Sequence, residues 1–467
     1  MLLSPENQLT QALPVLPVEI INDIIEEASG TLDVSSVSAI ALTSHTFRIH
    51  ANKARFSSLV PYRNHGHNIE HTSRGIRTLA DIIECGHSAK PSMPGVCEFV
   101  TSFSLQMIGY YDEVMPALED GRLAYIFNNL FWPSCLPPSS AARSLSLHIY
   151  RWSRNDDDYF FDDEDSPRYN GLSWRSIHPK LLIALEDLLR RSEITQLDLT
   201  EMRNIPRNFL QGSNVKHLRL GRSTISEIGS YYNYDNTAGG GPMLLESLDI
   251  DCLVSYKGIG LITHLDSDIP ESPRNILPHL VNLSVQVRHP GNLEIMNQVL
   301  DRAPALQSLI VDIWMDSRDY ISKQDSFSIN YKHLAQLNSI SFKIYEKKSS
   351  SAINLLLKYD APPSLSNLSI TIVHWARNPI TYPATEHLES TDINVLDNHL
   401  ARSSFYSVKH IDIVLVDISE ENYKEYRTPS HLAPWCSYIK SQLPLSLEKN
   451  PGLDVCVRWK DCVVWKG

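Results

Sequence analysis

The sequence predicts an α/β protein in which a short helical N-terminal segment precedes a long solenoid of strands and helices. A short pattern of alternating apolar and polar residues recurs from about residue 100 almost to the end of the chain, and helix-like stretches separate several copies. Of the 467 residues, 42% are apolar and only 21% are charged, which is enough to bury a large core. A strand that returns after about 20–45 residues has the spacing of a repeat architecture.

Charge and composition exclude several classes of function. The chain has 42 Lys and Arg against 54 Asp and Glu, a net charge of −12, whereas a nucleic-acid or membrane-surface partner requires a basic surface. No apolar run approaches the roughly 18 residues that span a bilayer, and the first residues lack the pattern of a secretory signal. The seven cysteines are scattered and form no CxxC pair. We therefore expect a cytoplasmic or nuclear protein with no nucleic-acid or membrane partner.

The first sixty residues predict two or three short amphipathic helices. In residues 13–30, Pro17 suits the first turn of a helix, and an apolar stripe begins at Ile20 and continues through Ile24. A second helical stretch covers residues 34–56. Helices this short cannot bury their apolar stripes completely against each other, so we expect a partner surface to cover the remainder.

The run Leu16-Pro17-Val18-Glu19-Ile20, with Ile24-Ile25 and the LTSHTFR stretch at 42–48, resembles the F-box over residues 13–56. This resemblance implies that the helices dock on a Skp-type adaptor and so join a cullin–RING ubiquitin ligase. The adaptor-binding residues that it implies are Leu16, Pro17, Ile20, Ile24, Leu42 and Phe47. The alternative is an N-terminal helical cap that binds nothing.

A possible metal motif lies in residues 61–95, which we interpret as a helical linker. His67, Glu70 and His71 match the H-x-x-E-H order of inverted zinc peptidases, which requires a helix. The third ligand of that family is missing, because no Glu occurs between Glu119 and Glu164. No phosphate-binding loop, dinucleotide fingerprint or G-x-S-x-G elbow is present either. We expect no metal, no cofactor and no enzymatic activity.

Eleven copies of the strand pattern follow. They occupy residues 100–107, 142–150, 194–202, 215–223, 244–252, 280–288, 306–314, 337–345, 365–373, 408–416 and 453–459. Helix-like stretches lie between several of them, at 180–191, 292–306, 352–365 and 393–405. The unit at 208–220, NFLQGSNVKHLRL, resembles an irregular leucine-rich repeat, and this resemblance spans about residues 96–467. The alternative is an ordinary α/β domain with a parallel sheet.

The alternation also predicts a binding surface. Apolar residues of each strand face the helices, so the residues between them form a concave sheet surface. The residues that we predict to bind a substrate there are Asp198, Arg219, Asp249, Trp314, Tyr345 and Trp375. The alternative for the three aromatic residues is packing under loops at the rim. An acidic insertion at 154–174 holds seven acids, and we interpret it as a solvated loop or a docking segment for a basic partner.

Together these features predict three regions, an F-box-like helical domain (1–60), the linker (61–95) and the solenoid (96–467). This order resembles that of F-box substrate receptors. The resemblance implies a non-catalytic substrate-recognition subunit of a cullin–RING (SCF-type) ubiquitin ligase, in which the F-box docks the adaptor and the solenoid binds a protein substrate. The alternatives are a leucine-rich-repeat interaction scaffold unconnected with ubiquitination and a zinc peptidase. One sequence does not specify the substrate of a repeat surface.

Overall fold

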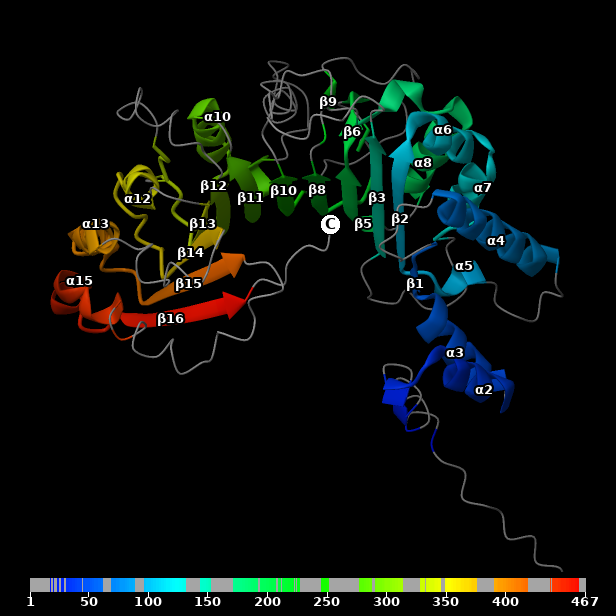
Figure 1. The fold of residues 1–467 in the computed structure, drawn as a ribbon, viewed down its shortest axis with the longest axis horizontal. Coiled ribbons are helices and arrows are strands. Elements are labelled where there is room, and N and C mark those ends of the chain that lie inside the picture. The colour runs from blue at the N-terminus through cyan, green and yellow to red at the C-terminus, as the bar shows by residue number, and fades with distance from the viewer. Residues whose placement is uncertain are drawn as a thin grey trace, which may run out of the picture.

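The structure, a computed structural model, describes most of the chain. The described residues are 17, 20, 23–24, 27–28, 31–43, 45–61, 69–88, 96–131, 143–152, 171–191, 194–206, 209–210, 212–221, 223, 225–226, 245–251, 277–287, 290–313, 328–331, 333–345, 349–375, 390–418, 437 and 439–461. They form a curved α/β array with a sheet on its inner side and helices on its outer side (Figure 1).

A twelve-stranded parallel sheet runs through the described residues, and each strand pairs with the next one along the chain. Its strands are β1 (Ser58–Leu59), β2 (Ser102–Tyr110), β3 (Arg143–Trp152), β5 (Ile194–Thr200), β8 (His217–Gly221), β10 (Ser247–Asp251), β11 (Asn282–Val287), β12 (Ser308–Ile313), β13 (Ser339–Tyr345), β14 (Asn367–Trp375), β15 (His410–Ile418) and β16 (Asp454–Asp461). All eleven predicted copies lie in this sheet. The strand order never reverses, as it would in a doubly wound domain, so a leucine-rich-repeat-like α/β solenoid is confirmed.

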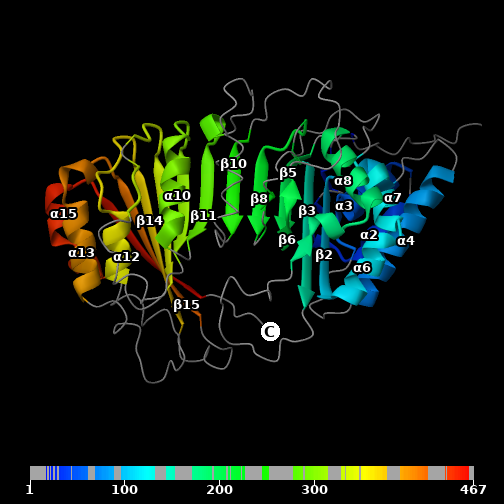
Figure 2. The same ribbon diagram turned by 90° about the horizontal axis from the view of Figure 1, so that it is seen from above.

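Helices cover the convex face of the sheet (Figures 1 and 2). They are α4 (Ile69–Ser88), α5 (Val96–Phe99), α6 (Tyr111–Glu119), α7 (Arg122–Asn129), α8 (Pro179–Arg191), α10 (Pro290–Asp301), α12 (Ser349–Leu356), α13 (Ser390–Leu400) and α15 (Pro444–Lys449). The described residues also form three single 3-10 turns, η1 (Trp174–Ser176), η2 (Leu277–His279) and η4 (Ser403–Phe405). None of the helices in the described part of the chain is both long and apolar enough to cross a membrane.

Three of the four predicted solenoid helices end earlier than the sequence pattern indicates. The helix predicted at 352–365 ends at Leu356, because Pro362 and Pro363 cannot lie inside a helix. The helix predicted at 292–306 ends at Asp301, and the chain then tightens into turns in which Ala303 N–H donates to the Leu300 carbonyl at 3.2 Å. The helix at 393–405 ends at Leu400, ahead of η4. In each case the chain turns back to enter the next strand.

One continuous core lies between the sheet and its helices. In every strand the residues that face the helices are leucine, isoleucine, valine, phenylalanine or methionine, and neighbouring strands bring them into register. One such row is Leu197, Leu218, Leu248, Leu283, Leu309, Ile340, Leu368, Ile411 and Val455. Its members are all buried. Near the N-terminal end, Phe103 of β2 meets Phe127 of α7 edge to face, with centroids 5.9 Å apart.

Two short parallel ladders extend the sheet at the ends of β3, β5 and β8. β4 (Leu172–Ser173) pairs with β6 (Met202–Arg203), and β7 (Ile205–Pro206) pairs with β9 (Ile225–Ser226). Glu201 and Asn204 have positive φ values of 62° and 54°, which turn the chain out of the main sheet on either side of β6. The strand pattern did not predict these ladders, because their strands are only two residues long.

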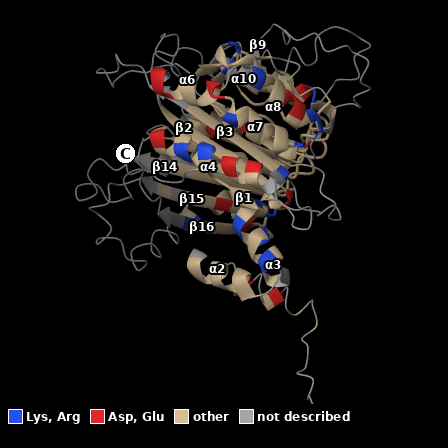
Figure 3. Ribbon diagram, turned by 90° about the vertical axis from the view of Figure 1, so that its right-hand side faces the viewer, with Lys and Arg blue, Asp and Glu red and all other residues tan. Residues whose placement is uncertain are grey.

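The N-terminal helices form a separate small unit. The predicted stretch 34–56 holds two helices, α2 (Val34–Thr43) and α3 (His45–Phe56), which extend away from the solenoid (Figures 1 and 3). The Asp33 carboxylate accepts hydrogen bonds from Ser35 N–H at 2.8 Å and Ser36 N–H at 3.0 Å, so it caps α2. Two residues of α2, Val37 and Ala41, and one residue of α3, Ala51, form a core of their own.

The connection between the two units is short. Ser57 alone separates α3 from β1, and its carbonyl accepts hydrogen bonds from Thr101 N–H at 2.9 Å and Ser102 N–H at 2.8 Å. The sheet thus begins at Ser58, ahead of residue 96, and α4 packs on the core within the range predicted as a linker. A hydrogen-bonded joint, rather than a loose tether, therefore links α3 to the sheet.

Candidate functional site

The face of the sheet opposite the helices carries aligned rows of polar side chains. In the middle row, which we call the concave row, successive strands contribute Ser104, Ser146, Asp198, Arg219, Asp249, Ser284, Ile310, Ser341, Ser369, Asp412 and Cys456. Parallel pairing in register produces this alignment, because strands of equal phase present every second residue to the same face.

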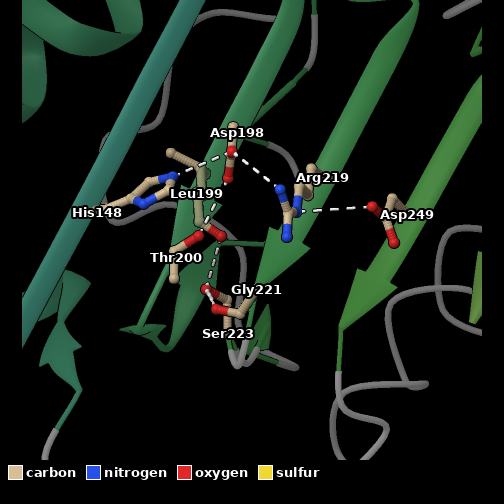
Figure 4. Close-up of polar contacts among 8 residues, drawn as sticks. All are labelled: His148, Asp198, Leu199, Thr200, Arg219, Gly221, Ser223 and Asp249. Atoms are coloured by element: carbon tan, nitrogen blue, oxygen red, sulfur yellow. Dashed lines mark hydrogen bonds and ion pairs between the residues drawn. The ribbon is translucent and has the colours of Figure 1, made fainter. Parts of the chain in front are cut away.

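Charges of opposite sign alternate along the first part of this row (Figure 4). His148 Nε2 lies 3.0 Å from Asp198 Oδ2, and Arg219 Nη1 lies 3.9 Å from the same oxygen. On its other side, Arg219 Nε lies 3.6 Å from Asp249 Oδ2. Thr200 Oγ1 donates a hydrogen bond to Asp198 Oδ1 at 3.1 Å. We call these five residues the Asp198–Asp249 cluster.

The electrostatics of the cluster keep Asp198 ionised. Partial burial raises the pKa of its carboxyl, but the hydrogen bond from His148 and the nearby charges of His148 and Arg219 outweigh burial and lower the pKa below its ordinary value. The Arg219 side chain stays half exposed between two carboxylates. The cluster can therefore offer fixed charges and hydrogen-bonding groups to a partner from a rigid strand framework.

Neighbouring backbone holds the cluster in place. A side chain on Gly221 would bring a Cβ atom within 2.6 Å of Thr200 Oγ1, so glycine allows β8 to lie close to the threonine that holds Asp198. The buried Ser223 hydroxyl accepts a hydrogen bond from Met202 N–H at 3.1 Å and lies 3.0 Å from the carbonyl oxygens of Leu199 and Gly221. This contact ties the end of β5 to β8 (Figure 4).

Further charged contacts lie farther along the sheet. Lys343 Nζ lies 3.5 Å from Asp312 Oδ2 and 4.9 Å from the centre of the Tyr345 ring. Burial lowers the pKa of Lys343, but the hydrogen bond to Tyr345 and the charge of Asp312 outweigh burial and raise it. Asp412 and Arg458 form a two-pronged ion pair, in which Nε donates to Oδ1 at 2.9 Å and Nη2 contacts Oδ2. These contacts join β12 to β13 and β15 to β16.

Ile310 interrupts the polar character of the concave row. Ile310 is 41% exposed although its side chain is large and aliphatic, and its neighbours in register are Ser284 and Ser341. Our sequence reasoning omitted both Ile310 and His148. The alternating pattern could have identified Ile310, because Leu309 and Val311 face the core and so place Ile310 on the opposite face.

The structure brings some of the predicted substrate-binding residues together. Asp198, Arg219 and Asp249 form one cluster, whereas Tyr345 lies beside Lys343 on β13, several strands away. Trp314 lies outside the described residues, and of Trp375 only the backbone, at the end of β14, is described. Residues 153–170, which hold all seven acids of the acidic insertion, also lie outside the described residues.

The predicted adaptor-binding residues are mostly exposed. Leu42 of α2 is 78% exposed, Ile24 is 54% exposed and Ile20 is 45% exposed. Pro17 is also exposed, Phe47 is half-buried and Leu16 lies outside the described residues. We call Ile20, Ile24 and Leu42 the N-terminal apolar surface. They are large hydrophobic side chains, whereas the described core between α2 and α3 is built from Val37, Ala41 and Ala51.

The metal motif is only partly described. Glu70 and His71 lie exposed in the first turn of α4, and His67 lies outside the described residues. Across the described ranges, no group of three or more His, Cys, Asp or Glu side chains could hold a metal ion. Comparison with models of known protein families and with curated proteins finds no match to this chain.

Proposed function

We propose that this chain is a non-catalytic substrate-recognition subunit of a cullin–RING (SCF-type) ubiquitin ligase, acting in the cytoplasm or nucleus. In this role the N-terminal apolar surface docks a Skp-type adaptor, and the concave face binds a protein substrate. The proposal combines the F-box resemblance of residues 13–56 with the solenoid that follows them.

The exposure of the N-terminal apolar surface is the observation that carries the proposal. Each large aliphatic side chain left in water forgoes about 1.5–3 kcal/mol of burial free energy. Leu42, Ile24 and Ile20 are exposed while the solenoid buries its leucines almost completely. Large exposed apolar side chains on short helices are typical of a protein interface. An adaptor surface would cover them and supply the burial that the helices lack.

The joint at Ser57 supports the second half of the proposal. Because the Ser57 carbonyl is hydrogen-bonded to Thr101 and Ser102, the N-terminal helices are anchored to the first strands of the sheet. A receptor of this kind would hold its substrate in a defined position relative to the adaptor. No covalent chemistry is required of this chain.

Co-purification of the full chain with a Skp-type adaptor tests the proposal. We expect the wild-type chain to form a stable complex, and Leu42→Asp to weaken it about tenfold or more, since a charge at the centre of an apolar interface is costly. The matched control is Leu447→Asp on α15, which replaces another exposed leucine at the opposite end of the chain. Absence of a wild-type complex, or equal binding by Leu42→Asp, would remove the basis of the proposal.

A leucine-rich-repeat scaffold unconnected with ubiquitination remains the second candidate. The observation that favours it is the polar concave face, which does not depend on the N-terminal helices for its construction. A chain that binds protein partners through the solenoid but fails to bind any Skp-type adaptor would support the scaffold instead.

A further inference from the structure

We infer that the concave face recognises an extended protein segment in the polyproline II conformation, in which an aliphatic side chain and a basic side chain lie three residues apart. In this arrangement Ile310 contacts the aliphatic side chain and Asp249 contacts the basic one. The inference rests on the proposed function of the concave face in binding a protein substrate, and it specifies the chemistry of that substrate.

Ile310 supplies the apolar contact. All other members of the concave row are serine, aspartate, arginine or cysteine, so Ile310 is the one large aliphatic in that row. It lies on β12, well inside the sheet, where no edge of the solenoid is near. An apolar residue surrounded by polar neighbours that exclude water is the usual composition of an interaction hot spot.

The charges around Ile310 favour a basic partner. On strands β5 to β13, the described side chains at alternate positions on this face include three acids, Asp198, Asp249 and Asp312, against two bases, Arg219 and Lys343, which gives 2 − 3 = −1. Both bases already contact carboxylates. An acidic partner would meet a surplus of like charge, whereas a basic partner would reduce it.

Asp249 is the acid best placed to meet such a base. Its side chain is 40% exposed, more than that of Asp198 or Asp312. A carboxylate has about four lone-pair sites, so Asp249 can keep the contacts that it already makes, the one with Arg219 among them, and accept a cation from the partner. Lysine or arginine at the matching position of the partner would then extend the alternation of charge seen from Asp198 through Arg219 to Asp249.

Strand spacing sets the distance between the two contacts. Asp249 lies on β10 and Ile310 on β12, with Ser284 of β11 between them in register. Neighbouring strands are about 4.8 Å apart, so the two positions are separated by about 10 Å across the sheet. A segment in the polyproline II conformation advances about 3.1 Å per residue with three residues per turn, so side chains three residues apart lie on the same side and are about 9 Å apart.

Selection of short random peptides displayed on a surface, with the full chain as bait at physiological ionic strength, tests this inference. We expect the selected peptides to be enriched in leucine, isoleucine or valine with lysine or arginine about three residues away. Ile310→Ser should remove the aliphatic preference, and Asp249→Asn should remove the basic preference. For an individual selected peptide, fluorescence anisotropy should give a dissociation constant about tenfold higher with Ile310→Ser.

The matched control is Ile183→Ser on helix α8, because Ile183 is also an isoleucine, is 38% exposed and lies on the opposite, convex side of the sheet. This variant should select the same peptides as the wild type. Enrichment of acidic peptides, no enrichment, or an unchanged preference in Ile310→Ser would overturn the inference. Adaptor co-purification separates this failure from failure of the proposed function, because a chain that binds the adaptor but shows no such peptide preference refutes the inference alone.

Discussion

The solenoid and the N-terminal helices differ in how far they bury their apolar residues. The solenoid stacks strand on strand and helix on helix, so each unit buries its leucines against the next and one core extends from α4 to β16. In the described part of the N-terminal unit, the separate core consists of Val37, Ala41 and Ala51. The comparison indicates that the solenoid obtains its stability from its own repeats, whereas Ile20, Ile24 and Leu42 in the N-terminal region leave apolar surface exposed.

Truncation of a core side chain should reveal the largest contrast. Phe103→Ala removes a fully buried ring that meets Phe127, so we expect it to lower the free energy of unfolding by about 3–5 kcal/mol. Leu42→Ala in α2 should change it by less than about 0.5 kcal/mol, because Leu42 is exposed. Urea unfolding followed by circular dichroism measures both. Equal effects of the two variants would contradict the comparison.

A smaller loss of stability is expected for a substitution near the start of the solenoid, at Gly75 of α4. A Cβ atom on Gly75 would overlap the Pro61 carbonyl oxygen, so α4 must pack there without a side chain. We expect Gly75→Ala to cost about 1–3 kcal/mol of stability through overpacking. In Gly452→Ala the nearest neighbouring atom is 3.9 Å away, so this variant should be tolerated. If thermal unfolding gave the two alanine variants the same midpoint, α4 would not be tightly seated against Pro61.

Acid should weaken the solenoid through a buried histidine. The His399 ring of α13 donates from Nε2 to Asn354 Oδ1 at 2.8 Å, and burial, assisted by the charge of Arg402, lowers its pKa from 6.5 to about 4. Between about pH 6.5 and about pH 4, this histidine binds a proton in the unfolded chain but stays neutral in the folded chain. The free energy of unfolding should therefore fall as the pH drops through this range. The urea midpoint should therefore decrease from about pH 7 to about pH 5, a range that spans the ordinary pKa of histidine.

His399→Gln supplies the control for this titration, because glutamine keeps a polar group but carries no titratable proton. Its urea midpoint should depend less on pH across the same window. A wild-type decrease that persists unchanged in His399→Gln would assign the acid sensitivity to other groups.

The smallest effect should be confined to the start of α2. Hydrogen bonds from Ser35 and Ser36 lower the pKa of Asp33, so its carboxylate stays charged at neutral pH and caps the helix. Asp33→Ala should speed amide hydrogen exchange in the first turn of α2, while Asp33→Ser, which can still cap, should restore protection. Because the cap is exposed, global unfolding should hardly change; a large loss of global stability would show that the two units unfold together.

Much of the solenoid could be predicted from local pattern. The alternation around Asp198, Arg219 and Asp249 assigned each to the face opposite the leucines, and the structure places all three in one cluster. Helix α8 was also predicted, from a different pattern, because its apolar stripe repeats with helical spacing over thirteen residues. By contrast, β1 has two residues and shows no period, so it could not be recognised before its pairing with β2 was known.

Period-two patterning alone was enough to establish the strands, their apolar face and their polar face, because a side chain's face depends only on its position in its own strand. The register between strands depends on the whole chain, and it decides that His148 meets Asp198 and that Ile310 lies two strands from Asp249. The same holds for the turns at Glu201 and Asn204, where tertiary contacts impose positive φ on residues that do not require it. The face on which a side chain lies is determined locally by its strand, whereas the distances between residues on different strands are determined only by the tertiary structure.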